Sequence, residues 1–541
     1  MKRRQIVSIC LSGMLSAAAV TGCGMKNAKS EKTGSPEVEY VEPATEAGAI
    51  VCESIASAEG RGQMIYDGMG MSEEYNAIKE NGFLSAAENP LSTFSVDVDT
   101  ASYSNIRRMI NRKQDISQDA VRIEEMINYF TYNYRKPEGN QPFDVTIELS
   151  DCPWNEDSQL LLIGLQAKEI DFDSRPMNNF VFLLDVSGSM YDADKLPLVQ
   201  KSFALLTEEL TENDRISIVT YAGNDSVVLE GVRGDEKVKI RQSLEELEAG
   251  GSTAGEAGIN KAYEIAEKYF IPNGNNRVVL ATDGDLNVGI SSEGELKSLI
   301  EEKKKSGVHL SVLGFGMGNI KDNKMEALAD NGDGNYAYID SLMEAKKVLV
   351  EEMGGTFLTV AKDVKIQVEF NSENVAGYRL IGYENRALGD EDFANDAVDA
   401  GEIGSGHRVT ALYEIIRDKE KMPVPVMKYQ NQEKDSRKDE GETQEFADEL
   451  LTVNIRYKEP DGGESKLLSY PALKEIYQEE MSPNMKWASG VAEFGMLLRD
   501  SPYKGSSSWE EVLKLGSSVP ENFMDDYKDE FLVIVRKVSD R

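Results

Sequence analysis

Five oxygen-bearing side chains occur at three points where an apolar or glycine-rich stretch ends. They are Asp185, Ser187, Ser189, Thr253 and Asp283. The first three form Asp-Val-Ser-Gly-Ser after an apolar run, the threonine follows Gly-Gly-Ser before a helical stretch, and the last aspartate lies in Thr-Asp-Gly. Carboxylate and hydroxyl oxygens suit a hard cation, so these residues predict an all-oxygen metal site.

The charge of this site favours one divalent ion. Few charged ligands, with water completing the shell, suit Mg²⁺ (or Mn²⁺) better than the carboxylate-rich cage typical of Ca²⁺, although Ca²⁺ has the same oxygen preference. Two aspartates cancel the charge of the ion, and the three hydroxyls are neutral. An open position can then accept a carboxylate from a partner at about 2.0–2.1 Å. Such a site binds without a catalytic base, and we expect no enzyme activity from it.

The segments that position these residues alternate between short apolar runs and helical stretches. We expect strands at 180–184, 216–221, 277–281 and 308–315, and helices near 195–210, 235–248, 255–270, 293–306 and 341–353. This rhythm predicts an α/β fold with a doubly wound, Rossmann-like, mostly parallel sheet, and places the site at its carboxyl edge, near the switch point in strand order. Residues 226–230 follow a short turn and predict an antiparallel edge hairpin.

Smaller regions flank this central part. Residues 90–176 predict an α+β unit with helices at 101–111 and 121–132, and residues 356–541 predict a strand-rich region. Its strands are expected at 364–370, 378–381, 408–416 and 451–457, with helices at 486–499 and 508–515. The charged insert 428–448 is interpreted as a solvated loop. Trp487 and Trp509 are expected to anchor a core.

The N-terminus has the pattern of a processing signal. Three basic residues precede the apolar run 6–20, which is too short to span a bilayer comfortably. The run ends in Val-Thr-Gly-Cys, which resembles the lipobox of bacterial lipoproteins and implies a signal peptide over 1–22 and a diacylated Cys23. A secretory signal cut nearby and a signal anchor are the alternatives. Lipidation implies a bacterial cell membrane or envelope location, facing outside the cytoplasm.

Residues 23–89 are expected to form a flexible tether with one short helix at 72–79. Cys52 lies in this tether and Cys152 in the next region. The two cysteines either form a disulfide, which an extracytoplasmic location allows, or remain free thiols.

The order D-x-S-x-S, then Thr after Gly-Gly-Ser, then T-D-G resembles the metal-ion-dependent adhesion site (MIDAS) of von Willebrand factor type A (VWA) domains. The resemblance covers residues 177–355 and implies that all five residues are metal ligands. Residues 94–103, 124–130 and 404–414 are similar to flanking regions of a bacterial group of VWA lipoproteins. The resemblance implies a membrane-anchored protein-binding module that captures an acidic residue of a partner. The first alternative is a scaffold lipoprotein whose metal only stabilises the fold. The second alternative is an enzyme whose chemistry lies in a flanking region.

Other constellations favour structural interpretations. Asp97-Val98-Asp99 resembles a phosphatase D-x-D signature but lacks the residue expected two positions later, so we interpret it as a strand ending in a turn. Residues 330–335, Asp-Asn-Gly-Asp-Gly-Asn, lack the glycine and glutamate of a calcium loop and predict a helix-to-strand turn. No G-x-S-x-G elbow occurs, and neither His309 nor His407 has an evident nucleophile partner.

The composition excludes some classes of partner and of metal site. The 541-residue chain carries 95 acidic and 59 basic side chains, a formal charge of −36, which argues against nucleic acid as a partner. Two histidines and four cysteines leave little for zinc sites or a disulfide framework. The length predicts two or three domains.

Overall fold

The computed structural model describes residues 73–541, with gaps at 97–98, 171–175, 223–225, 252–254, 285–292, 319, 353–357, 399 and 424–445. The signal peptide, Cys23, Cys52, Thr253 and most of the charged insert lie outside the described residues. Within the described part, no helix is long and apolar enough to cross a membrane.

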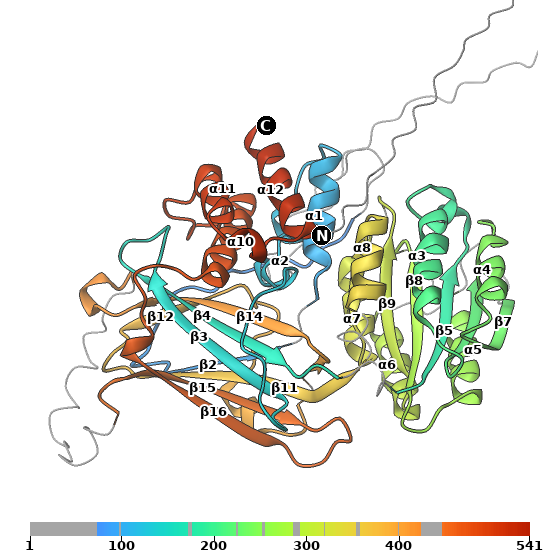
Figure 1. Cartoon of the computed structure of the whole chain (residues 1–541), viewed down its shortest axis with the longest axis horizontal. Helices are drawn as coiled ribbons and strands as arrows, with labels where there is room; N and C mark the ends of the chain where they lie inside the picture. The colour runs from blue at the N-terminus through green and yellow to red at the C-terminus, as the bar shows by residue number, and fades with distance from the viewer. Residues whose placement is uncertain are drawn as a thin grey trace, which may run out of the picture. The chain divides into compact units, whose positions relative to one another are not determined.

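A six-stranded sheet forms the central domain, drawn in green to yellow in Figure 1. Its strands are β5 (Asn178–Asp185), β6 (Arg215–Tyr221), β7 (Ser226–Arg233), β8 (Asn275–Thr282), β9 (His309–Phe315) and β10 (Tyr336–Ile339). The strand order is β7-β6-β5-β8-β9-β10, and every pair is parallel except β6 with β7. This is a doubly wound sheet with its switch point between β5 and β8. The predicted fold class and the predicted edge hairpin are confirmed.

Helices cover both faces of this sheet. One face packs against α3 (Leu196–Glu209), α4 (Lys237–Glu245) and α8 (Leu342–Lys346), which continues into the π-helix η5 (Lys347–Glu351). The other face packs against α5 (Gly255–Lys268), α6 (Glu293–Lys303) and α7 (Asp322–Asn331). Along β5, Phe180 and Phe182 belong to the first core, whereas Val181 and Leu183 belong to the second. Burial on both faces explains why this strand is continuously apolar.

The flanking regions before and after the central domain share two antiparallel sheets (Figure 1). The first has the order β1-β12-β14-β4-β3 and the second β13-β11-β15-β16, with β2 paired to β11. The strands before the central domain are β1 (Leu84–Ser85), β2 (Leu91–Ser95), β3 (Phe143–Asp151) and β4 (Gln159–Ala167). Those after it are β11 (Thr359–Phe370), β12 (Gly377–Ile381), β13 (Gly401–Gly404), β14 (Arg408–Ile416), β15 (Glu449–Lys458) and β16 (Lys466–Leu473). The two flanks, separate along the sequence, therefore form one body.

A helical layer packs on the first of these sheets. It contains α1 (Ala101–Asn111), α2 (Ile123–Asn128), α10 (Pro483–Arg499), α11 (Trp509–Ser517) and α12 (Asp526–Ser539). On β4, Leu160 and Leu162 contact this helical core, whereas Leu161 and Ile163 contact the core between the two sheets. Trp487 is fully buried in the helical core, and Trp509 packs against it, as predicted.

The flanking body covers the open edge of the central sheet. Asp99 Oδ1 accepts a hydrogen bond from the backbone N–H of Tyr336 (2.9 Å), and Ser104 Oγ donates to the carbonyl of Tyr338 (2.7 Å). Both bonds go to β10, the last strand at this edge. Side chains of the flank thus satisfy backbone groups that a further strand would otherwise bind.

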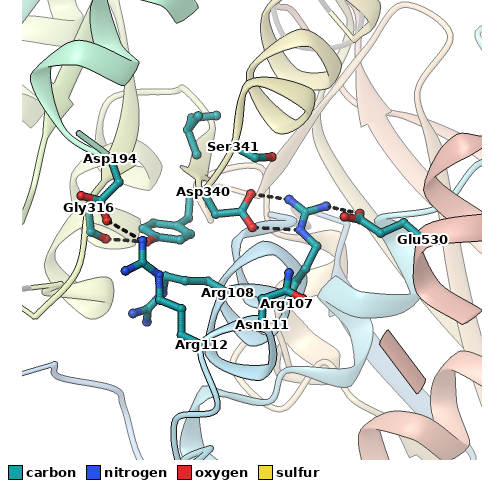
Figure 2. A pocket seen from close by; sticks show the side chains of 11 residues that line it. Arg107, Arg108, Asn111, Arg112, Asp194, Gly316, Asp340, Ser341 and Glu530 are labelled. Atoms are coloured by element: carbon teal, nitrogen blue, oxygen red, sulfur yellow. Dashed lines mark hydrogen bonds and ion pairs between the residues drawn. The ribbon is translucent and has the colours of Figure 1, made fainter. Parts of the chain in front are cut away.

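Buried arginines join the same two parts. Arg107 on α1 donates to Asp340 and Glu344 (2.7 Å) of the central domain and to Glu530 (2.8 Å) on α12. Figure 2 shows its guanidinium between Asp340 and Glu530. The guanidinium and the Asp340 and Glu344 side chains are at most 9% exposed, which makes this contact structural rather than a screened surface pair.

Two expectations about the N-terminal part were wrong. Residues 73–79 form no helix, and Glu74 instead makes a parallel bridge to Lys321. Residues 84–85 of the expected tether pair with β12, so the tether ends before residue 89. Long-range pairing overrides the weak local helix preference of this segment. Cys152 is a buried free thiol whose pKa burial raises to about 12.

Candidate metal centre

The two aspartates of the predicted site end neighbouring parallel strands. Asp185 is the last residue of β5, and Asp283 directly follows β8. These strands are paired in register, with Leu184 opposite Ala281. Because the strands flank the switch point, their carboxyl ends open into the crevice where doubly wound sheets bind ligands. The structure therefore brings Asp185 and Asp283 together, as predicted.

The turn after β5 presents the two serines. The backbone N–H of Ser187 donates to Asp185 Oδ1 (2.9 Å), which closes the turn around the carboxylate. The hydroxyls of Ser187 and Ser189 lie 3.0 Å apart, and a short 3₁₀ helix follows at Gly188–Tyr191. Ser187 is 2% exposed, whereas Ser189 is exposed. The hydroxyl pair thus extends from the buried carboxylate towards the surface.

The glycine pair before Thr253 is fastened to this turn by two backbone hydrogen bonds. Gly250 N–H donates to the carbonyl of Val186 (2.7 Å), and Gly188 N–H donates to the carbonyl of Gly251 (3.2 Å). Gly251 has φ +91°, and a Cβ there would lie 2.9 Å from the carbonyl oxygen of Ala222. Only glycine fits this close approach. Thr253 itself, two residues on, lies outside the described residues.

Burial sets the electrostatics of the site. Asp185 and Asp283 are both fully buried. Burial raises the pKa of Asp185 to about 6; the hydrogen bonds from Ser187 oppose this rise, and the negative charge of Asp283 adds to it. Tyr221 and Thr282 each donate a hydroxyl hydrogen bond to Asp185 Oδ2 at 3.2 Å. Because two buried acids lie close together at one edge, a cation bound there would stabilise their ionised forms.

A lysine that the sequence did not single out lies in the site. Lys195 Nζ donates to Asp283 Oδ2 (2.8 Å) and to the backbone carbonyl of Ser189 (2.9 Å). It precedes α3 and is 6% exposed. A single lysine before a helix is usually a solvated residue, so its type and position alone gave no signal.

The donor set fits a hard divalent ion. Asp185, Ser187, Ser189 and Asp283 supply carboxylate and hydroxyl oxygens on two adjoining loops, and no sulfur or imidazole lies among them. No group of three or more His, Cys, Asp and Glu residues in the described part is arranged to hold a metal. A site of two aspartates and hydroxyls does not require such a group.

The other constellations have structural roles where they are described. Residues 330–335 connect α7 to β10, which confirms the predicted helix-to-strand turn, and Asp333 pairs with Lys304 at 2.9 Å. Asp99 holds the edge of β10, whereas Asp97 and Val98 lie outside the described residues. His309 begins β9, and burial lowers its pKa to about 3.

The strand order and the loops at its switch point define a VWA-domain protein. The family model for the von Willebrand factor type A domain matches residues 179–352, and another model, von Willebrand factor, matches residues 70–162. A third model, the C-terminal region of uncharacterized protein YfbK, matches residues 355–540. The three models together match the central domain and both flanks.

One relative spans most of the chain. Uncharacterized protein YfbK of Escherichia coli (strain K12) is 41% identical over 468 residues, which cover 85% of this chain and 80% of that protein. The chain therefore belongs to the family of bacterial VWA-containing proteins that includes YfbK.

Other similarities are partial. Human inter-alpha-trypsin inhibitor heavy chain H3 is 27% identical over 34% of this chain and 21% of its own length. The solved structure of a von Willebrand factor type A protein from Catenulispora acidiphila covers 76% of this chain and 91% of its own, with 16% identity and a TM-score of 0.41.

Proposed function

We propose that this protein is a membrane-anchored, extracytoplasmic binding module whose VWA domain captures an acidic side chain of a partner protein through a divalent ion. The observation that carries the proposal is the pair of fully buried carboxylates, Asp185 and Asp283, beside the serine hydroxyls at the switch point. The geometry supports binding rather than catalysis, because it supplies ligands for an ion and no nucleophile is needed.

The charged and the neutral site residues would have different roles. Asp185 and Asp283 would neutralise the ion, and Ser187, Ser189 and the predicted ligand Thr253 would add neutral oxygens. A bound divalent ion of this kind supplies a Lewis-acidic position for an external carboxylate. The exposed side of the site is formed by Ser189 and Gly188, so the partner would approach from there.

The location rests on the N-terminal sequence. Diacylation of Cys23 would hold the chain at a membrane surface, since two acyl chains are what stable anchoring requires. Metabolic labelling with a radioactive or alkynyl palmitate tests this part of the proposal. Label should appear in the wild-type protein and disappear in Cys23→Ala.

Metal titration tests the site. Calorimetric titration of the full chain with Mg²⁺ and Mn²⁺ should show saturable binding at one site, and Asp185→Ala should abolish it. Asp214→Ala is the matched control, because Asp214 is an equally buried aspartate that caps backbone N–H groups beside the amino end of β6. This variant should keep the metal site. Equal binding by wild type and Asp185→Ala would contradict the assignment.

The scaffold alternative has its own supporting observation. The arginine-centred contacts of the central domain with the flanking body are extensive and buried, as a domain used for packing requires. In that case Asp283→Ala would lower the thermal unfolding temperature, and no protein would be retained in a metal-dependent manner by the wild-type chain.

A further inference from the structure

Lys195 is placed in the metal centre by the fold. Its ammonium bridges the carboxylate of Asp283 and the backbone of Ser189, two of the predicted ligand residues from different loops. The side chain is 8% exposed and that of Asp283 0%, so bulk water does not screen this pair. A bridge of this kind supplies positive charge inside the site.

The neighbouring strand leaves room for this side chain. Gly316 follows the end of β9 with φ +76°, and a Cβ at this position would overlap the Cγ, Cδ and Cε atoms of Lys195. The Tyr338 hydroxyl of β10 donates to the carbonyl of Gly316, which fixes the backbone around the lysine. The position of the Lys195 side chain therefore depends on Gly316, which follows β9, and on Tyr338 of β10.

The residue before Lys195 also makes an ion pair. Asp194 pairs at 3.0 Å with Arg112, the residue that follows α1, and Figure 2 shows Asp194 and Gly316 near each other above Arg112. The loop that carries the lysine therefore also contacts the flanking body. Lys195 cannot leave the site without moving this loop or changing its own rotamer.

We propose that Lys195 is a tethered counter-cation that competes with the divalent ion for Asp283, so that metal binding is an exchange of charges. The inference rests on the proposed metal site. A divalent ion shared by Asp185 and Asp283 meets the nearby ammonium as a like charge, which weakens its binding. In the metal-free protein the same ammonium stabilises the buried carboxylate. Lys195 therefore lowers the metal affinity and stabilises the site when no metal is bound.

The test compares Mg²⁺ affinity in three forms of the full chain by calorimetry. Lys195→Met keeps the unbranched stem, shorter by the terminal ammonium, and removes its charge, and should bind Mg²⁺ about tenfold more tightly than wild type. Lys195→Arg keeps the charge and should remain within about threefold of wild type. A thermal unfolding scan supplies the second readout: Lys195→Met should unfold at a lower temperature than wild type in EDTA and gain more from added Mg²⁺.

The outcomes separate this inference from the proposed function. If wild type binds Mg²⁺ and Lys195→Met binds with equal or lower affinity, the competition is refuted while the metal site stands. If neither chain binds, both fail. If only Lys195→Met binds, the lysine excludes the metal, which supports the exchange. Should Lys195→Met not fold, Lys195→Gln provides the same comparison, because it also removes the charge but keeps a polar hydrogen-bond donor.

Discussion

Buried carboxylates of the VWA domain are neutralised in two different ways at two of its regions. Where the domain meets the flanking body, guanidinium groups bind them: Arg122 contacts Asp322 (2.7 Å) and Glu326 (3.0 Å) of the VWA domain, beside Glu125 (2.8 Å) of its own flanking body. At the candidate metal centre, the acids meet hydroxyls, a backbone N–H group and one flexible ammonium. The residue types are alike, but the cations differ in how easily they are replaced.

The difference follows from the chemistry of the two cations. A guanidinium offers five donors in a rigid plane and always carries its charge, so several carboxylates can be fixed around it. An ammonium is a compact charge on a flexible chain, and another cation can take its place. The first region is therefore suited to holding two parts of the protein together, and the second to reversible binding.

The largest expected effect is on partner capture. Proteins retained by the immobilised full chain in Mg²⁺ should be released completely by EDTA, and the Asp185→Ala chain should retain none of them. Because this chain is strongly acidic, raising salt from low to moderate strength should increase retention of an acidic partner, since repulsion beyond about 8 Å is screened. A steep loss with salt would instead indicate recognition of a basic partner.

Removing an arginine from the first region should damage stability rather than binding. Arg107→Met leaves Asp340 and Glu344 without this guanidinium in a buried contact, and should lower the free energy of unfolding by about 3–5 kcal/mol. Urea denaturation measures this loss, while Mg²⁺ titration below the transition should give wild-type affinity. A loss below about 1 kcal/mol would show that the contact is not structural.

A third kind of buried carboxyl group has no cation bonded to it in the described part of the chain. Glu493 on α10 is fully buried and makes no ion pair within the described residues; burial raises its pKa to about 7. The folded state therefore holds its proton where the unfolded chain, with a pKa near 4.5, has lost it. Its contribution to stability is complete below pH 4.5 and falls by roughly 3 kcal/mol as the pH rises through 7.

Glu493→Gln should remove this pH dependence. Denaturation from pH 4.5 to 8 should show the variant close to wild type at the acid end and more stable by roughly 1–3 kcal/mol at the alkaline end. Parallel curves for the two proteins would mean that the carboxyl group is ionised in the fold.

The smallest effect is expected at an exposed ion pair between the flanking body and the VWA domain, Arg112 with Asp194. The Arg112 side chain is 45% exposed, and its pair with Asp194 is screened by solvent. Arg112→Ala should change the free energy of unfolding by less than about 0.5 kcal/mol. Asp194 directly precedes Lys195, so the Arg112→Ala variant also tests the candidate metal centre. Its Mg²⁺ affinity should differ from that of wild type by less than about threefold, and a larger change would indicate that the flanking body influences metal binding.

The features that the sequence predicted well are local. The boundaries of α1, the antiparallel β7 and the placement of Asp185 and Asp283 at neighbouring strand ends all follow from patterns within short windows. Continuous apolar runs between helical stretches are enough to indicate a doubly wound sheet, and the topology then brings the strand ends together.

The features that it did not predict depend on distant contacts. Pairing of β4 with β14 joins residues separated by the whole central domain, and no local pattern encodes that choice of partner. The final apolar stretch at 531–535 belongs to helix α12, with four residues buried and one exposed. Lys195 acquires its role only because Gly316, on another strand, makes room for it.

The shared sheets of the flanks have a mechanical consequence. The VWA domain is an insertion between β4 and β11, so the chain enters it from one strand of the flanking body and returns to another. If the domain captures a partner as proposed, a pull on that partner would be divided between these two covalent crossings, and the Arg107 and Arg122 contacts would help to resist separation of the domain from the flanking body. A domain attached at one end would carry the same force through a single linker.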